Sequence, residues 1–385
     1  MNIGLDSFPL WNSMGRGIGN YAISLYQKVI SQTCNQSNKI FILNWRSESL
    51  KKYLIETQNY TEYQVDAEKN SPLEVSYVKE QIQKFVKMYE INVFYTPNAL
   101  EQQMPYYEKE WFGGTKLIGT VHDIIPWKMK KWYFATGGGE KYKSYCENLA
   151  EYDLLFSQSN TTKKDLEEEF GIVNVVNISM SSEIPQIDQV QLDKKFDEIR
   201  KKFNIAESYN IFVGGLGINK NLPNIVRAYL QAYQSNRTIN ALVIVCKLNE
   251  GVKKDIYSFI KRYNLQEKLI FTDYVEEIEM AALHLYADWC VFPTLYEGFG
   301  MPVIEAWKYG LPVLTSDNSS LYEITQNAAV HVNPNSVESI RNGFELIDKM
   351  DNVERERYRK LGQERVKHFS WDKTAKMFMD EILGL

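Results

Sequence analysis

Two glutamates, Glu297 and Glu305, stand eight positions apart in a segment that also contains Gly298, Gly300 and Pro302. On one straight helix their side chains would be about 80° apart in rotation and about 12 Å apart along the axis. Pro302 suits the first position of a helix, where its missing N–H costs nothing. We therefore expect Glu297 in a loop and Glu305 in the first helical turn, so that both carboxylates bracket one hydroxyl-bearing ligand.

The backbone of the same segment adds a second kind of contact. An apolar run ends at Phe292, and the free N–H groups near 300–303 would attract negative charge or polarised oxygen. A lone glutamate is most simply a solvated acid, but two acids with Gly and Pro at a strand's carboxyl end favour a binding site. Because Glu297 is expected in a loop, its replacement should change stability little.

A glycine-rich segment, 212–221, supplies the complementary charge. Its glycines, among them Gly215, allow the backbone to approach phosphates closely, and Lys220 provides a cation. Turn formation is the simpler explanation for a glycine-rich loop taken alone. Lys220 and the helix start near Gly300 would together neutralise a leaving diphosphate. No metal or other cofactor is then required, and the four histidines and four cysteines are too scattered to predict a metal site.

Two further motifs lie in the first half of the chain. His122 follows the apolar run 117–121, at a strand end where a reacting group can be reached. Gly17 and Gly19 lie in a glycine-rich loop after the first strand, with Arg16 beside them. A structural histidine and a flexible loop are the simpler alternatives for these motifs.

The segment 126–134 interleaves lysines with aromatic residues, and its members Trp127, Lys128, Lys130, Lys131 and Trp132 are suited to an anionic membrane surface. Three lysines contribute about 1 kcal/mol each there, which is enough for reversible contact only. A solvated loop with partly buried tryptophans explains the segment equally well.

These motifs must be positioned by alternating strands and helices. Short apolar runs alternate with helical patterns, which predicts parallel sheets covered by helices, and the alternation breaks near 180–205. We predict an α/β protein with two Rossmann-like domains facing a central cleft: residues 1–190, residues 205–365, and a last helix within 366–385 that packs back on the first domain.

The bulk composition excludes other classes. The chain has 385 residues, a net charge of −5 and 44% hydrophobic residues, so a nucleic-acid-binding surface is not expected. The first residues do not resemble a signal peptide, and no run approaches a membrane span. We expect a cytoplasmic protein, in peripheral contact with the inner face of a membrane if the basic segment binds it.

The string from Tyr296 to Pro302, closed by Glu305, resembles the donor signature of the retaining glycosyltransferases of family four, which have the GT-B fold. Four further segments resemble that family: residues 310–313 with Ser316, the loop 214–221, the V-H-D-x-x-P element around His122, and the loop 15–21. The resemblance implies transfer of a hexose from a nucleotide-sugar donor to a glycan, lipid-linked or other hydroxyl acceptor in surface polysaccharide synthesis.

The resemblance also implies residue roles. His122 and Glu297 would be catalytic, with Glu297 facing the donor sugar, and Glu305 would hold the ribose. The other implied donor-binding residues are Gly17, Gly19, Gly215, Lys220, Asn221, Gly298, Phe299, Gly300 and Met301.

The chain departs from the family pattern at two positions, because Asn20 and Asn219 stand where the family has arginine. These departures leave open a non-catalytic transferase-like subunit that binds a glycan or a partner. A different enzyme, such as a sugar-nucleotide epimerase or a phosphorylase, also stays open because it could share two such domains and a similar cleft.

Overall fold

The computed structural model describes residues 1–13, 17–33, 38–54, 59–65, 67 and 73–385. The chain forms two compact units. The N-terminal unit comprises residues 1–181 and 369–385, and the C-terminal unit comprises residues 182–368.

The N-terminal unit contains a parallel sheet of seven strands in the order β3-β2-β1-β4-β5-β6-β7. The apolar runs predicted as strands form its centre and are buried. The strand order reverses between β1 and β4, so the connections that follow these two neighbouring strands run toward opposite edges of the sheet. The strands are β1 Asn2–Asp6, β2 Lys39–Asn44, β3 Tyr60–Gln64, β4 Val93–Thr96, β5 Lys116–Val121, β6 Leu154–Ser157 and β7 Val175–Asn177.

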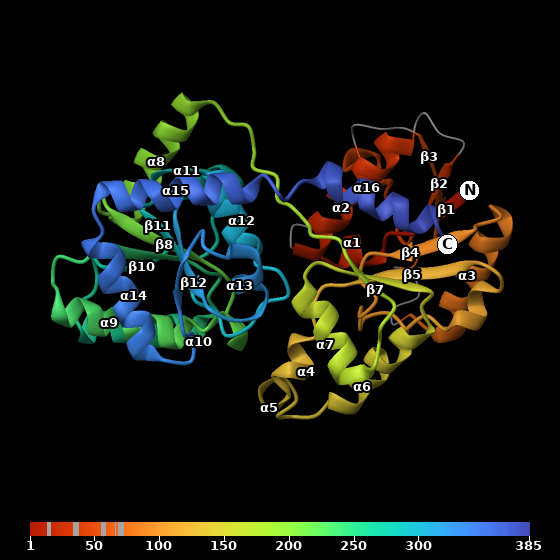
Figure 1. The fold of residues 1–385 in the computed structure, drawn as a ribbon, viewed down its shortest axis with the longest axis horizontal. Coiled ribbons are helices and arrows are strands. Elements are labelled where there is room, and N and C mark those ends of the chain that lie inside the picture. Colours follow the sequence, from red (N-terminus) through yellow and green to blue (C-terminus); the bar gives the residue numbers. More distant parts are fainter. Residues whose placement is uncertain (14–16, 34–37, 55–58, 66, 68–72) are drawn as a thin grey trace. The chain divides into compact units, whose positions relative to one another are not determined.

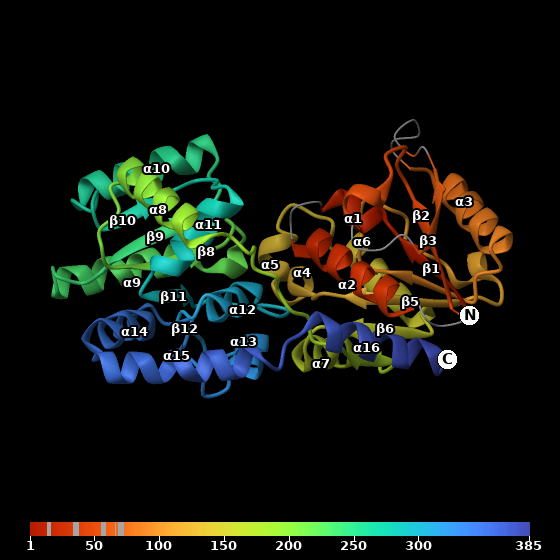
Figure 2. The ribbon, with the colours of Figure 1, turned by 90° about the horizontal axis from the view of Figure 1, so that it is seen from above.

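Helices cover this sheet, and the last one comes from the far end of the chain. Helix α16 lies alongside α2 (Figure 1 and Figure 2). Phe378 of α16 is fully buried, with its ring centroid 4.7 Å from that of Tyr95 and 5.1 Å from that of Phe156. The helices are α1 Phe8–Asn12, α2 Gly17–Thr33, α3 Val75–Met88, α4 Ile125–Lys128, α5 Lys130–Tyr133, α6 Gly139–Asn148, α7 Asn160–Phe170 and α16 Trp371–Leu383.

The C-terminal unit contains a parallel sheet of six strands in the order β10-β9-β8-β11-β12-β13. The order reverses between β8 and β11, which pair directly. Together the two sheets confirm the prediction of two Rossmann-like α/β domains. The strands are β8 Tyr209–Val213, β9 Ala241–Val245, β10 Leu269–Phe271, β11 Trp289–Phe292, β12 Val313–Ser316 and β13 Val330–Val332.

Helices cover both faces of the second sheet. Helix α9 packs against α14 on one face, and α8 packs against α11 on the other (Figure 1). In the described part of the chain, no helix is both long and apolar enough to cross a membrane. The helices are α8 Gln189–Phe203, α9 Leu222–Ser235, α10 Glu250–Arg262, α11 Glu277–Tyr286, α12 Met301–Lys308, α13 Ser319–Thr325, α14 Val337–Lys349 and α15 Asn352–Val366, with a 3-10 turn, η5, at Ile218–Lys220.

Candidate active site

Two loops of the C-terminal unit meet where its strand order reverses. One loop, 214–221, follows β8 and leads into α9, and the other, 293–300, follows β11 and leads into α12. Parallel sheets of this kind bind ligands beyond the carboxyl ends of the strands at such a reversal. The two motifs singled out in the sequence therefore lie side by side at the position where a ligand is expected.

A direct ion pair joins the two loops. Lys220 Nζ donates to both carboxylate oxygens of Glu297, at 2.8 Å and 3.0 Å, and lies 5.3 Å from the centre of the Phe292 ring. Glu297 is only 6% exposed, so its position in a loop does not leave it solvated, and the small effect of its replacement on stability stays a prediction. A buried carboxylate is stabilised by a paired cation, and Lys220 therefore pairs with Glu297 in addition to any contact with a ligand.

Asn219, which stands where the resemblance predicts arginine, braces the loops against each other. Its Nδ2 donates to the carbonyl oxygen of Tyr296 at 3.2 Å, and its own carbonyl accepts from the backbone N–H of Leu295 at 2.7 Å. The residue is buried. An amide at this position therefore supplies no charge to a ligand but fixes the loop that carries Glu297.

Asn221 is also engaged within the protein. Its backbone has φ = 62°, a left-handed conformation that asparagine tolerates. Its Nδ2 donates to the carbonyls of Pro293 and Pro334, and its Oδ1 accepts from Asn224. The side chain thus holds Lys220 and the start of α9 in place, and a direct contact with a donor stays a prediction.

Gly300 determines where α12 begins. It has φ = 107°, and a Cβ built on it would lie 2.5 Å from Leu321 Cδ2, so a larger residue would be strained and would clash. Helix α12 starts at Met301, with Pro302 in its first turn. The loop just before it contains Gly298 and the buried Phe299.

Two serines of α13 hold the Glu297 loop, and the sequence analysis did not identify them. Ser320 Oγ donates to the carbonyls of Glu297 and Phe299, at 2.9 Å and 3.0 Å, and Ser319 Oγ accepts from the Glu297 backbone N–H at 3.3 Å. The signal was a pair of hydroxyl residues three and four positions after β12, at the same sheet edge.

Glu305 is the fifth residue of α12, beyond the first turn where it was expected. It is half-buried, and Ser182 Oγ donates to its Oε1 at 3.3 Å. Lys308 Nζ contacts the Ser182 carbonyl. Burial raises the pKa of Glu305 to about 7, although the Ser182 hydrogen bond and the Lys308 charge oppose the shift. Near neutral pH a large fraction of this carboxyl is therefore protonated.

In the N-terminal unit, His122 follows β5 and is held through both ring nitrogens. Nε2 lies 2.8 Å from the Pro97 carbonyl and so carries the proton, while Nδ1 accepts from Gln158 Nε2 at 2.6 Å. The ring of Tyr21 packs against it edge-on at 5.0 Å. Burial lowers the pKa of His122. The imidazole is therefore neutral, with its tautomer fixed by Gln158 and Pro97.

Comparison with known proteins bears on what these sites do. Residues 195–365 match the family described as Glycosyl transferases group 1. The chain is 26% identical over 283 residues to the Serotype-specific mannosyltransferase WbdA of Escherichia coli, covering 70% of this chain and 34% of that protein. It is 24% identical to the O-antigen chain mannosyltransferase B of Escherichia coli, covering 72% and 69%.

The chain is thus a glycosyltransferase homologue. Solved structures agree on its GT-B fold: sucrose-phosphate synthase from Thermosynechococcus elongatus has a TM-score of 0.70 at 17% identity, covering 100% of this chain and 98% of that one. HepE of Anabaena, solved with UDP and glucose, has a TM-score of 0.72 at 13% identity, covering 100% of both chains. The chain spans about a third of the length of WbdA.

The remaining candidate residues of this glycosyltransferase homologue are glycines at the start of α2 and in the loop after β8. Gly17 is the first residue of α2, and Gly19 is buried within its first turn, so both belong to a helix and not to the expected loop. Arg16 lies outside the described residues. Gly215 is exposed, and a Cβ built on it would have open space around it. Their contacts with a donor stay predictions.

The basic-aromatic segment of the glycosyltransferase homologue divides into two parts. Trp127 Nε1 donates to Glu169, and Lys128 pairs with Asp165 and Glu169, so this half is held against α7. The other half is exposed on α5, and Trp132 has 66% of its surface accessible. The surface available to a partner consists of Lys130, Lys131, Trp132 and Tyr133.

Proposed function

We propose that this chain is a retaining glycosyltransferase of the family-four type, which moves a hexose from a nucleotide-sugar donor to a hydroxyl acceptor. The observation that carries the proposal is the Lys220–Glu297 pair, set beside the start of α12 where the strand order reverses. A cation and a carboxylate are thus paired between the two loops that lead into α9 and α12. This set suits a diphosphate attached to a sugar.

Each charged residue has a role in this proposal. Lys220 and the N–H groups at the start of α12 neutralise the charge that develops on the leaving diphosphate, so we propose that no metal is needed. Glu297 accepts hydrogen bonds from hydroxyls of the donor sugar. Glu305, as carboxylate, accepts them from the ribose. When the diphosphate binds, Lys220 contacts both the ligand and the Glu297 carboxylate. This shared contact adjusts the position of the carboxylate.

His122 supports the sugar as a neutral group in this proposal. Its lowered pKa and fixed tautomer suit a hydrogen bond to a sugar hydroxyl better than proton transfer. To make that bond, the imidazole must exchange its contact with Pro97 or Gln158. Gln158 thereby becomes a positioning residue for His122.

Mannose is the sugar that the relatives suggest. WbdA and the mannosyltransferase B are named for mannosyl transfer, and the second is named for the O-antigen chain. We therefore propose a mannosyl donor and a glycan or lipid-linked glycan acceptor in surface polysaccharide synthesis.

The test is a screen of UDP-, GDP-, ADP- and dTDP-sugars by thermal shift, followed by transfer assays with the best ligand with and without EDTA. We expect one nucleotide-mannose to raise the melting temperature, transfer to survive EDTA, and NMR of the product to show the anomeric configuration of the donor. Inversion, or loss of transfer in EDTA, would contradict the corresponding part of the proposal.

We also propose that the exposed part of the basic-aromatic segment contacts the inner face of a membrane. Two lysines and a tryptophan on α5 are accessible, and this is the combination that settles at an anionic interface. Trp127 and Lys128 are left out of this surface because they are paired within the protein.

A further inference from the structure

Three aromatic rings from distant parts of the chain form a cluster in the N-terminal unit. Tyr21 lies on α2, His122 follows β5, and Trp371 is the first residue of α16. The ring centroids of Tyr21 and His122 are 5.0 Å apart with an angle of 87° between the rings, and those of Tyr21 and Trp371 are 5.6 Å apart. Tyr21 thus links the imidazole that follows β5 to the last helix of the chain.

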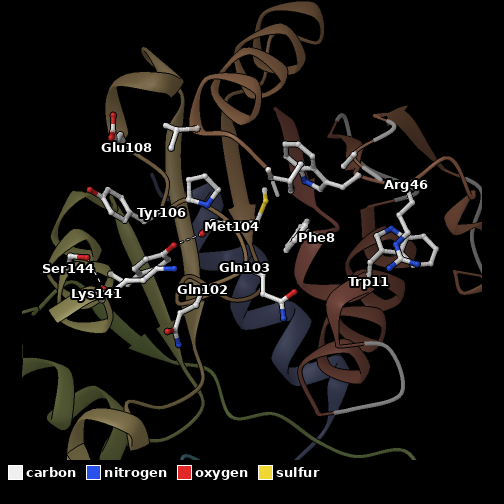
Figure 3. A pocket seen from close by; sticks show the side chains of 16 residues that line it. Phe8, Trp11, Arg46, Gln102, Gln103, Met104, Tyr106, Glu108, Lys141 and Ser144 are labelled. Carbon is white, nitrogen blue, oxygen red and sulfur yellow. Dashed lines mark hydrogen bonds between the residues drawn. The ribbon is translucent and has the colours of Figure 1, made fainter. Parts of the chain in front are cut away.

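The same unit contains a cavity of about 910 Å³, whose walls include the segments that follow β1, β2 and β4 (Figure 3). Trp11, Met104 and Tyr106 belong to its lining. Of the described residues that line this cavity, none is a member of the ring cluster. The role of the cluster must therefore follow from what its own rings contact.

Tyr21 is held in place at its hydroxyl group. Its Oη lies 3.1 Å from Thr120 Oγ1 and 3.2 Å from Tyr95 Oη, and these two partners lie 2.7 Å from each other. The side chain of Tyr21 is fully buried. Because Thr120 lies on β5, two residues before His122, this network couples Tyr21 to the strand that positions the imidazole.

Trp371 is held by packing and by the hydrogen bonds of its neighbours. It is only 5% exposed, and within the described residues its Nε1 has no hydrogen-bond partner. Ser181 Oγ donates to the Phe369 carbonyl at 3.1 Å, and Thr374 Oγ1 donates to the Ser179 carbonyl at 2.6 Å. The start of α16 is therefore fixed, and the indole contributes a packed ring and not a hydrogen bond.

The imidazole of His122 needs such a support in addition to its own hydrogen bonds. The contacts with Pro97 and Gln158 direct the two ring nitrogens. They resist rocking of the ring about the line between those nitrogens only weakly, because a small tilt changes the hydrogen-bond angles little. A second ring packed at 87° against the imidazole opposes this rocking.

We propose that Trp371 is a positioning residue that acts through Tyr21 and holds the His122 ring in the orientation needed to meet the donor sugar. The part of His122 in transfer rests on the proposed function, whereas the positioning of its ring does not. A misplacement of about 1 Å in such a group can cost about 100-fold in rate, so the rings that support His122 affect turnover.

The test combines transfer kinetics with histidine NMR of the full chain. Trp371→Leu removes the ring, whereas Trp371→Phe keeps an aromatic ring and is the conservative rescue. We expect kcat to fall about tenfold in the first variant and to stay within about twofold of wild type in the second, with unchanged Kd for the nucleotide in both. The nitrogen chemical shifts of the His122 ring, assigned with His122→Gln, should move in Trp371→Leu toward the average of the two tautomers.

Two further variants complete the test. Phe85→Leu on α3 removes another buried ring of the same unit, and it should leave kcat and the His122 shifts unchanged. Tyr21→Phe keeps the ring but removes the hydroxyl, while Thr120 and Tyr95 retain their hydrogen bond to each other. It should lower kcat about threefold, and it decides the case if Trp371→Leu does not fold.

The outcomes separate this proposal from the proposed function. Unchanged kcat and unchanged His122 shifts in Trp371→Leu, or equal losses of kcat in Trp371→Leu and Phe85→Leu, would overturn the positioning role. If Trp371→Leu does not fold, wild-type kcat in Tyr21→Phe would overturn it. Movement of the His122 shifts in Trp371→Leu, in a chain whose wild type transfers no sugar, would support the positioning of the ring and refute the proposed function.

Discussion

At the residue scale, the central feature of the proposed site is the ion pair between Lys220 and Glu297. Lys220→Ala removes the cation from a carboxylate that is only 6% exposed. We expect a loss of about 1–3 kcal/mol in the free energy of unfolding, together with weaker binding of the nucleoside diphosphate. Chemical denaturation and calorimetry measure the two effects.

A double substitution distinguishes this coupling from general damage. Lys220→Ala combined with Glu297→Gln should be less destabilised than the sum of the single variants, because no unpaired charge is left buried. Glu297→Gln alone should lower the transfer rate by about 100-fold or more. Lys109→Ala, which breaks the Lys109–Asp153 pair of the N-terminal unit, is the control and should leave nucleotide affinity unchanged. Additive losses would contradict the coupling.

Glu305 gives a pH dependence. Burial raises its pKa from 4.5 to about 7 in the folded chain, so the folded state binds more protons than the unfolded state between these values. The contribution of Glu305 to stability is therefore present below about pH 4.5 and is lost as the pH rises toward about 7. The wild type should lose more stability over this window than Glu305→Gln, measured by denaturation at several pH values.

The same group should affect nucleotide binding in the opposite direction. The carboxylate, not the acid, accepts two ribose hydroxyl bonds, so affinity should rise between about pH 6 and pH 8 in the wild type. In Glu305→Gln the affinity should be nearly flat. An equally steep rise in the variant would place the titrating group elsewhere.

At the element scale, the start of α12 depends on one glycine. Gly300→Ala introduces a side chain at φ = 107° and 2.5 Å from Leu321. We expect it to cost about 1–3 kcal/mol of unfolding free energy, and to lower transfer because the helix start moves. Gly215→Ala is the comparison, since a Cβ there has open space. It should keep its stability and weaken diphosphate binding, as followed by thermal melts and calorimetry.

Helix α5 is the element for which we predict contact with an anionic membrane. Lys130→Glu combined with Lys131→Glu should reduce co-sedimentation with vesicles containing anionic lipid, because each lysine contributes about 1 kcal/mol at such a surface. Lys84→Glu combined with Lys87→Glu on α3 is the matched control. Equal loss of co-sedimentation in both double variants would show that only the net charge of the protein matters. If the wild type does not bind the vesicles even at low salt, an acceptor that is not membrane-bound is the better hypothesis.

At the scale of the whole molecule, the chain crosses between the units twice, and α16 belongs with the N-terminal unit. Phe378→Ala should therefore destabilise that unit by about 3–5 kcal/mol through loss of a fully buried ring. Phe344→Ala, equally buried in α14, should act on the C-terminal unit. Hydrogen exchange that shows each substitution loosening only its own unit would support this; the reverse would contradict it.

The sequence by itself determined the type of fold and the position along the chain of the two motifs of the proposed donor site. The buried strand β11 is a continuous apolar run, β8 is interrupted only by Asn210, and Gly and Pro mark the helix start after β11, so local patterns suffice to predict them. The segment of β3 does not stand out as an apolar run, because it is an edge strand with polar residues and little burial. The segment of β7 is too short to show a period, because it has only three residues.

Only the tertiary structure decided which groups contact each other. The pairing of Lys220 with Glu297, separated by 77 positions, follows from the neighbouring places of β8 and β11 in the sheet. The raised pKa of Glu305 and the lowered pKa of His122 both follow from burial, and the tautomer of His122 follows from its contacts with Pro97 and Gln158 on neighbouring strands' loops. Residue spacing cannot encode these features, because strand order and desolvation arise only when distant segments pack together.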